Sequence, residues 1–249
     1  MDQQFPGKLV IYDINKIMFM NNCDTNIVIL FVSGMGNNIF NPVYSMEIYK
    51  FCNDHKITFV QPQLRSYPHY GLYTLDDDID DLMKVINYLG PRKYIFIGHS
   101  TGCQDIIYLS RIYQPILCIL QGPVSDREYE EKKGCLFKKI PDENIFFYRN
   151  QPMIKQRYRD LYTIYGKDDI FSSDLPDSFY EKLNINKTKI YFVLSENDEY
   201  TFETDVLKYK FGLVKNSEVR VISGATHDLS NHESEFMNII KEILQPIIK

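Results

Sequence analysis

The sequence predicts an α/β fold in which helices cover both faces of a mostly parallel β-sheet. Six short apolar runs have the length of buried strands, and they lie at residues 27–32, 57–60, 94–97, 116–120, 190–194 and 219–222. The runs are continuous rather than alternating, which is typical of strands that are covered on both faces. Helical patterns separate most of them, and this alternation of strand and helix favours parallel pairing.

Local signals predict the remaining elements. Two apolar runs at residues 9–12 and 17–20 come first, and we expect them to pair as antiparallel strands at an edge of the sheet. A helix is predicted over residues 75–89, where apolar side chains recur at helical spacing, with Thr74 as its N-cap and Gly90 at its end. Further helices are expected at residues 101–113 and along the apolar stripe of Phe236, Ile239, Ile240, Ile243 and Leu244.

One long stretch interrupts the alternation. Roughly 65 residues separate the runs that end at Leu120 and begin at Ile190, against about 2–6 residues plus one helix in an ordinary connection. The stretch has helical patterns at residues 126–133 and 153–165 but no clear strand. We therefore expect a single domain, residues 1–249, with a core of about residues 1–121 and 188–249 and an inserted helical cap at about 122–187.

Composition and charge exclude several classes of protein. The 249 residues contain 28 Lys and Arg against 33 Asp and Glu, a net charge of −5 without a basic block, which argues against nucleic-acid binding. The longest apolar runs reach six residues, whereas a membrane-spanning helix needs about 20. The first eight residues lack the layout of a signal peptide, and the five cysteines form no CxxC pair. We expect reduced thiols and a cytoplasmic location.

The most informative segment is residues 94–102, which reads as a strand, then G-x-S-x-G, then the start of a helix. In this arrangement Ser100 stands on a sharp turn, so that its Oγ projects above the sheet as a nucleophile. Gly98 and Gly102 leave room for the neighbouring backbone, and the helix N-terminus favours negative charge. The alternative is an ordinary strand–turn–helix with a passive serine.

A nucleophilic serine needs a base, and the base needs an acid that orients it. In the order Ser, Asp, His, the acid follows a late strand, where Asp198 is favoured over Glu196 and Glu199. His227 follows the last strand and is the predicted base, ahead of His232, which lies near the start of the final helix. Sequence order disfavours His55 and His69, and orientation across the turn disfavours His99.

Backbone N–H groups that stabilise an oxyanion are predicted from position alone. One is the amide of Thr101, directly after the serine, and the other is that of Met35, in the loop after residues 27–32. Glycines flank Met35 and allow its backbone to turn inward. The same Gly-x-Gly hints only weakly at a dinucleotide site, because position 39 is isoleucine rather than a third glycine.

Taken together, these motifs resemble those of the α/β-hydrolases. The chain is more specifically similar to a little-characterised family of fungi, plants and protists, some of whose fungal members are siderophore esterases. The similarity is carried by residues 98–105, 121–128, 168–175 and 195–200. It implies an α/β-hydrolase fold, with Ser100 as nucleophile, Asp198 as acid and His227 as base, acting on a small-molecule carboxylic ester without a cofactor or metal.

Residues around the expected pocket depart from the family pattern. The segment 66–71 lacks the usual serine-rich run and tryptophan, and the cap is short. The resemblance therefore leaves the substrate open. Candidates for the pocket lining are Tyr67, Tyr70, Tyr129 and Tyr162.

Two family segments lie in or beside the insertion. We interpret Ser125 as a helix N-cap, followed by an Asp126/Arg127 pair at the surface. The aspartates Asp168, Asp169 and Asp174 are interpreted as capping and turn residues rather than as a metal site.

The sequence thus predicts a serine hydrolase that cleaves a carboxylic ester through an acyl-enzyme. A thioesterase or acyltransferase with the same triad is one alternative. A binding protein that kept the fold without the activity is another, because a fold alone does not imply a reaction. The sequence indicates no oligomeric state.

Overall fold

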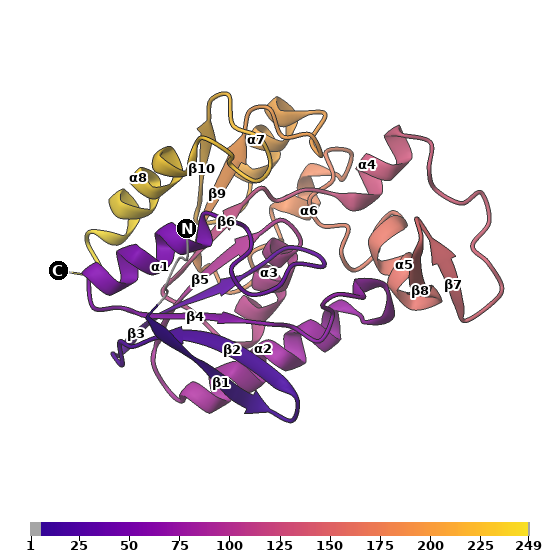
Figure 1. The fold of residues 1–249 in the computed structure, drawn as a ribbon. Helices are drawn as coiled ribbons and strands as arrows, with labels where there is room; N and C mark the ends of the chain where they lie inside the picture. Colours follow the sequence, from indigo (N-terminus) through magenta and orange to yellow (C-terminus); the bar gives the residue numbers. More distant parts are fainter. Residues whose placement is uncertain (1–5, 249) are drawn as a thin grey trace.

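An eight-stranded, mostly parallel sheet forms the centre of the computed structural model, which describes residues 6–248 (Figure 1). The strand order is β1-β2-β4-β3-β5-β6-β9-β10, with β1 and β2 antiparallel at one edge and the six strands from β4 to β10 parallel. The predicted fold class and the antiparallel edge pair are confirmed. The strands are β1 (Gly7–Asp13), β2 (Lys16–Asn21), β3 (Ile27–Val32), β4 (Thr58–Pro62), β5 (Lys93–His99), β6 (Leu117–Gln121), β9 (Lys189–Ser195) and β10 (Ser217–Ile222).

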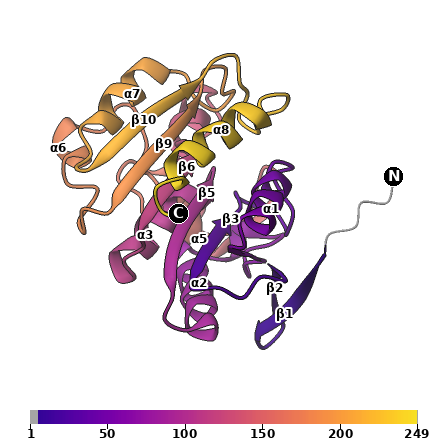
Figure 2. The same cartoon turned by 90° about the vertical axis from the view of Figure 1, so that its left-hand side faces the viewer.

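Helices cover both faces of this sheet, as the two views show (Figures 1 and 2). The core is double, because successive strand residues point to opposite faces: Leu30 belongs to one apolar cluster, whereas Ile29 and Phe31 belong to the other. The first cluster includes residues of α2 (Leu75–Leu89), α3 (Gly102–Ile112) and α7 (Thr204–Gly212), and the second those of α1 (Ser45–Asp54) and α8 (Glu233–Leu244).

Helix α2 begins and ends where the sequence predicts. The Thr74 hydroxyl accepts a hydrogen bond from the Asp77 amide, and the Asp77 carboxylate accepts one from the Thr74 amide at 2.8 Å, which makes a capping box. At the other end Gly90 has φ of +79°, a conformation that glycine adopts at little cost.

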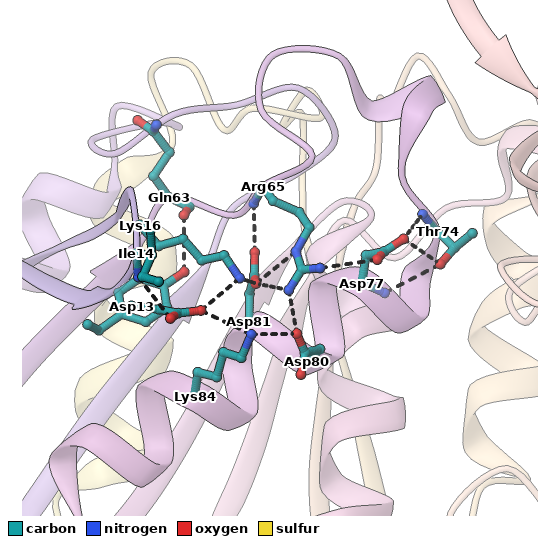
Figure 3. A network of polar contacts seen from close by, with 11 residues as sticks. Asp13, Ile14, Lys16, Gln63, Arg65, Thr74, Asp77, Asp80, Asp81 and Lys84 are labelled. Atoms are coloured by element: carbon teal, nitrogen blue, oxygen red, sulfur yellow. Dashed lines mark hydrogen bonds and ion pairs between the residues drawn. The ribbon is translucent and has the colours of Figure 1, made fainter.

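An ion-pair network fastens α2 to the antiparallel edge (Figure 3). The buried Asp81 carboxylate accepts hydrogen bonds from Lys16 Nζ at 2.5 Å and from Arg65 Nε at 2.9 Å. One helix residue thereby holds both the β1–β2 hairpin and the loop that follows β4. Lys84, one turn further along α2, adds a 3.0 Å ion pair to Asp13.

The insertion contains a hairpin that the sequence analysis did not predict. Strands β7 (Ile145–Tyr148) and β8 (Gln151–Ile154) pair antiparallel around the two-residue turn of Arg149 and Asn150. Both turn residues have positive φ, +47° and +61°, as a tight hairpin with right-handed twist requires. The expectation of no strand here was wrong because each strand has only four residues and the turn lacks glycine.

The rest of the insertion falls into two parts. Its first part holds α4 (Asp126–Lys132) and α5 (Lys155–Tyr162), and it has a small apolar cluster of its own that includes Tyr148, Met153 and Tyr158. Its later part, with α6 (Asp177–Tyr180), buries Phe171, Leu175 and other side chains in the main core. Only the first part therefore has a core separate from that of the sheet.

Within residues 6–248, no helix combines the length and the apolar character that crossing a bilayer requires. The reading of the first eight residues as lacking a signal peptide rests partly on residues 1–5, which lie outside the described part of the chain.

Candidate active site

Ser100 stands on a strained turn between β5 and α3. Its φ is +53°, a left-handed conformation that is uncommon for residues other than glycine and that occurs at the nucleophile turn of hydrolases. A Cβ on Gly98 would lie 2.6 Å from the Gly102 carbonyl oxygen, and one on Gly102 would lie 2.4 Å from the Val32 oxygen. The two glycines are therefore required by close backbone contact.

His227 and Asp198 meet at the carboxyl ends of β10 and β9. The ring atom His227 Nδ1 lies 2.8 Å from Asp198 Oδ2, and both side chains are buried. The other carboxylate oxygen of Asp198 accepts the Tyr200 amide at 3.0 Å. The contact with Asp198 Oδ2 places the proton of a neutral imidazole on Nδ1 and leaves Nε2 free to accept one.

The competing residues have other partners. Glu196 accepts hydrogen bonds from Ser223 Oγ at 2.6 Å and from the Gly224 amide, away from the imidazole. Glu199 accepts the backbone amide of His227 at 3.0 Å, so it holds the loop rather than the ring. His232 Nδ1 contacts the Ser230 carbonyl oxygen at 3.1 Å.

Ser100 and His227 line one cavity of about 380 Å³, together with His99, Gly34 and Met35. The volume lies within the range of small-molecule sites. The structure records no hydrogen bond between Ser100 Oγ and the imidazole of His227, both of which are described. Such bonds are often long in the absence of substrate.

Gln121, at the end of β6, connects the serine turn to the histidine loop. Its backbone carbonyl accepts the Ser100 amide at 3.0 Å, and its side-chain Nε2 donates to the His227 carbonyl at 3.1 Å. Its Oε1 contacts His99 Nδ1 at 2.6 Å and accepts the Tyr44 hydroxyl at 2.7 Å. Because the His227 carbonyl can only accept, this network fixes the orientation of the amide and gives His99 a proton on Nδ1.

The two amides expected to face an oxyanion differ in their surroundings. Thr101 lies at the N-terminus of α3, directly after the serine. The Met35 amide donates a 2.6 Å hydrogen bond to Thr101 Oγ1. The Met35 N–H is thus engaged by a side chain in the structure.

Of the four tyrosines expected at the pocket, Tyr70, Tyr129 and Tyr162 line the cavity and Tyr67 does not. Tyr70 lies on the 3₁₀ turn η1 (Tyr70–Leu72), which packs against β8 so closely that a Cβ on Gly71 would lie 2.3 Å from the Pro152 oxygen. Tyr67 precedes that turn and is not among the residues that line this cavity. The lining residues that sequence reasoning missed come mainly from the insertion and the loops, and they include Asp126, Glu130, Arg149 and Tyr200.

The family aspartates of the insertion form ion pairs. Asp168 binds Arg157 Nη1 through both oxygens at 2.9 Å, and Asp169 binds Arg127 Nε at 3.0 Å, while Arg127 also pairs with Asp174. Ser125 caps α4 as expected, by accepting the Glu128 amide at 3.1 Å. The expectation of a surface pair between Asp126 and Arg127 was wrong, because Arg127 is buried and pairs with Asp169 and Asp174 of the later part of the insertion and with Glu131 of α4.

Comparison with known proteins places the chain in a family. A family model described as "Protein of unknown function (DUF1749)" matches residues 1–139 and 130–248. The chain belongs to this family. It is 28% identical over 286 residues to the UPF0613 protein PB24D3.06c of Schizosaccharomyces pombe, with 93% of this chain and 90% of that protein covered. It is 26% identical over 163 residues to Esterase AN6793 of Emericella nidulans, which covers 49% of this chain and 44% of that one.

Solved structures identify the fold. The siderophore hydrolase EstB from Aspergillus fumigatus superposes with a TM-score of 0.77 at 18% identity, covering 99% of this chain and 98% of EstB. The metagenomic α/β hydrolase MGS-MChE2 superposes with a TM-score of 0.66 at 14% identity, covering 96% and 98%. This DUF1749 protein therefore has the α/β-hydrolase fold.

Proposed function

We propose that this protein is a serine hydrolase that cleaves a carboxylic ester through Ser100, His227 and Asp198. The observation that carries the proposal is the 2.8 Å contact between His227 Nδ1 and Asp198, with Ser100 on a strained turn at the same cavity. Acyl transfer by a serine requires a nucleophilic hydroxyl that the substrate can reach, a base that takes its proton, and an acid that orients the base.

The relatives support hydrolysis of an ester. One is named an esterase and another a siderophore hydrolase, and the resemblance of the motifs already pointed to such enzymes. Neither name settles the substrate here, because the segment 66–71, of which Tyr70 lines the cavity, departs from the family pattern.

The proposed reaction has two steps. His227 Nε2 takes the proton of Ser100 as Oγ attacks the ester carbonyl carbon, whose double-bond electrons move to oxygen. The tetrahedral oxyanion then collapses, the C–O bond to the alcohol breaks, and the alcohol leaves with the proton from Nε2. Water attacks the acyl-serine in the same way, and the carboxylic acid leaves as the proton returns to Ser100.

The oxyanion would be stabilised by the amides of Thr101 and Met35. The Thr101 amide lies at the positive end of the α3 dipole, which favours negative charge. The Met35 amide would donate to the oxyanion after its hydrogen bond to Thr101 Oγ1 breaks. The second donor would therefore form when the substrate binds.

Cytoplasm is the proposed compartment. All five cysteines are free thiols in the structure, and Cys52, Cys103 and Cys118 are buried. Free thiols persist in reducing compartments.

Labelling with a fluorophosphonate probe tests the proposed function. We expect wild-type protein to be labelled on Ser100, identified by peptide mass, and to hydrolyse short nitrophenyl esters. Ser100→Ala should abolish both, whereas Ser230→Ala, at a serine outside the cavity lining, serves as the control. Folded wild-type protein that stays unlabelled and inert would make this a binding protein rather than an enzyme.

A further inference from the structure

The cavity beside Ser100 contains a carboxyl group that is not paired with a cation. Apart from histidines and tyrosines, three ionisable side chains line it: Asp126, Glu130 and Arg149. Glu130 is already neutralised, because Arg149 Nε lies 3.0 Å from Glu130 Oε2 and the Tyr148 hydroxyl donates to the same oxygen at 2.8 Å. Asp126 is the remaining acidic side chain. Among the described residues it has neither an ion pair nor a hydrogen bond.

This carboxylate is poorly solvated. Burial is the main cause that raises the pKa of Asp126 to about 7; Asp168 adds to the rise, whereas Arg157 and His227 oppose it. Arg157 itself is engaged by both oxygens of Asp168. A partly buried carboxylate without a partner is costly, and a bound cation would remove that cost.

Aromatic rings complete the surroundings of Asp126. Tyr70, Tyr162 and Tyr200 line the same cavity, and the face of a tyrosine ring attracts organic cations. Tyr129 also lines it but already holds a cation, because Lys133 Nζ lies 4.3 Å from the centre of its ring. Carboxylate and tyrosines together have the composition of sites that bind ammonium groups.

The charge also matters for the proposed reaction. An ionised carboxylate in the cavity that Ser100 lines disfavours the developing oxyanion, because like charges repel. A cationic group on the substrate would screen Asp126 from the oxyanion. The same repulsion would exclude anionic esters.

We propose that the substrate is an ester bearing an alkylammonium group, and that Asp126 is the residue that selects it. The inference rests on the proposed ester hydrolysis. It adds the charge of the substrate, which neither the triad nor the fold determines.

Isosteric ester pairs test the selection. The first pair is butyrylcholine, whose charge lies on the alcohol side, and its neutral analogue with carbon in place of the quaternary nitrogen. The second pair is a nitrophenyl ester whose acyl chain ends in trimethylammonium, and its neutral tert-butyl analogue. In at least one pair we expect wild-type kcat/KM to favour the cation by about tenfold or more. Asp126→Asn should reduce that ratio to about one.

A matched control separates a local effect from a change in net charge. Glu131→Gln also removes one negative charge from α4, but Glu131 is exposed, pairs with Arg127 and lies outside the cavity lining. We expect it to keep the wild-type ratio. Equal ratios in wild type and Asp126→Asn, or a preference for the neutral esters, would overturn the inference. A preference for a carboxylate-bearing ester would overturn it too and would assign recognition to Arg149.

Binding without catalysis separates this inference from the proposed function. Butyltrimethylammonium chloride, titrated calorimetrically into wild type and Asp126→Asn, should bind the former at least about tenfold more tightly. If no ester is hydrolysed but this difference is found, the hydrolase proposal fails and the cation site stands. If esters are hydrolysed and labelled but neither test shows a difference, the hydrolase stands and the cation site fails.

Discussion

The side-chain amide of Gln121 donates a hydrogen bond of 3.1 Å to the backbone carbonyl of His227. The backbone carbonyl of the same glutamine accepts the amide of Ser100 at 3.0 Å. The proposed nucleophile and base come from segments more than a hundred residues apart in sequence, and one fully buried residue at the end of β6 contacts both, Ser100 through its backbone and His227 through its side chain. Their relative position therefore depends on Gln121.

Gln121→Glu should reduce activity in a pH-dependent way. When ionised, the introduced carboxylate would place an oxygen next to the His227 carbonyl oxygen, and the two would repel each other. Repulsion displaces the histidine loop, and a displacement of about 1 Å can reduce the rate about a hundredfold. At lower pH the introduced side chain is protonated and can donate again. We expect the ratio of Gln121→Glu to wild-type kcat/KM to rise as pH falls, as measured by ester hydrolysis across the pH range.

Tyr44→Phe is the matched control for Gln121→Glu. It removes a buried hydrogen bond of 2.7 Å to the same glutamine but leaves the contact to His227 intact. The ratio of its kcat/KM to that of wild type should be close to one and independent of pH. Similar losses in the two variants would mean that Gln121 supports the fold without positioning the histidine.

Gly122→Ala should damage the site more than the fold. Gly122 has φ of +60°, and a Cβ there would lie 3.1 Å from both Cε1 and Nδ1 of His227. The methyl group must push the imidazole or its loop, so we expect kcat/KM to fall by about a hundredfold. Gly134→Ala is the control, because Gly134 has a similar φ of +67° but no atom near the added Cβ. We expect the two variants to have equal melting temperatures but unequal activities. Equal activities in Gly122→Ala and Gly134→Ala would contradict the prediction.

Sequence order predicts where the members of the proposed triad lie, because each of them follows a strand. Ser100 follows β5, Asp198 follows β9 and His227 follows β10, and the carboxyl ends of parallel strands meet at one edge of the sheet. A motif that directly follows an apolar run is therefore predicted to lie at this edge of the sheet. Helix α2 was predictable for a similar reason, since its cap and its apolar stripe are local.

The cavity wall could not be predicted in this way. Arg149 reaches the cavity from a two-residue turn without glycine, and Glu130 is held there by a partner from β7. The contacts of Gln121 reach three other segments, at Tyr44, at His99 and Ser100, and at His227, and they follow no sequence period. Such sites depend on pairings between distant residues, and a single sequence contains no local signal for them.

Asp81→Asn should destabilise the protein. Asp81 is fully buried and accepts from Lys16 and Arg65, so its loss leaves two cations without their central partner. Removing one member of a buried ion pair costs about 3–5 kcal/mol, and the partial exposure of both cations reduces this to about 2–3 kcal/mol. Urea unfolding measures the change. Asp76→Asn, at an exposed acid of the same helix, should cost less than about 1 kcal/mol.

His99 should make folding sensitive to acid. Burial and the nearby His227 lower the pKa of His99 from an ordinary 6.5 to about 3, against the opposing effect of the Gln121 hydrogen bond. Below pH 6.5 the unfolded chain therefore binds a proton that the folded chain excludes, and the stability that His99 contributes is lost as pH falls toward 3. Asp78 and Asp126 have the opposite effect, because burial raises the pKa of each to about 7 and the folded chain takes up their protons first.

The contribution of His99 is therefore measured as the difference in free energy of unfolding between wild type and a variant at this position. His99→Asn keeps an N–H donor near the position of Nδ1 for Gln121 but has no group to protonate. Relative to wild type, we expect its free energy of unfolding to rise by about 1.4 kcal/mol for each pH unit below about 6.5. His55→Gln, at an exposed histidine, is the control for the removal of an imidazole. A difference between His99→Asn and wild type that is constant with pH would mean that the folded protein can protonate His99.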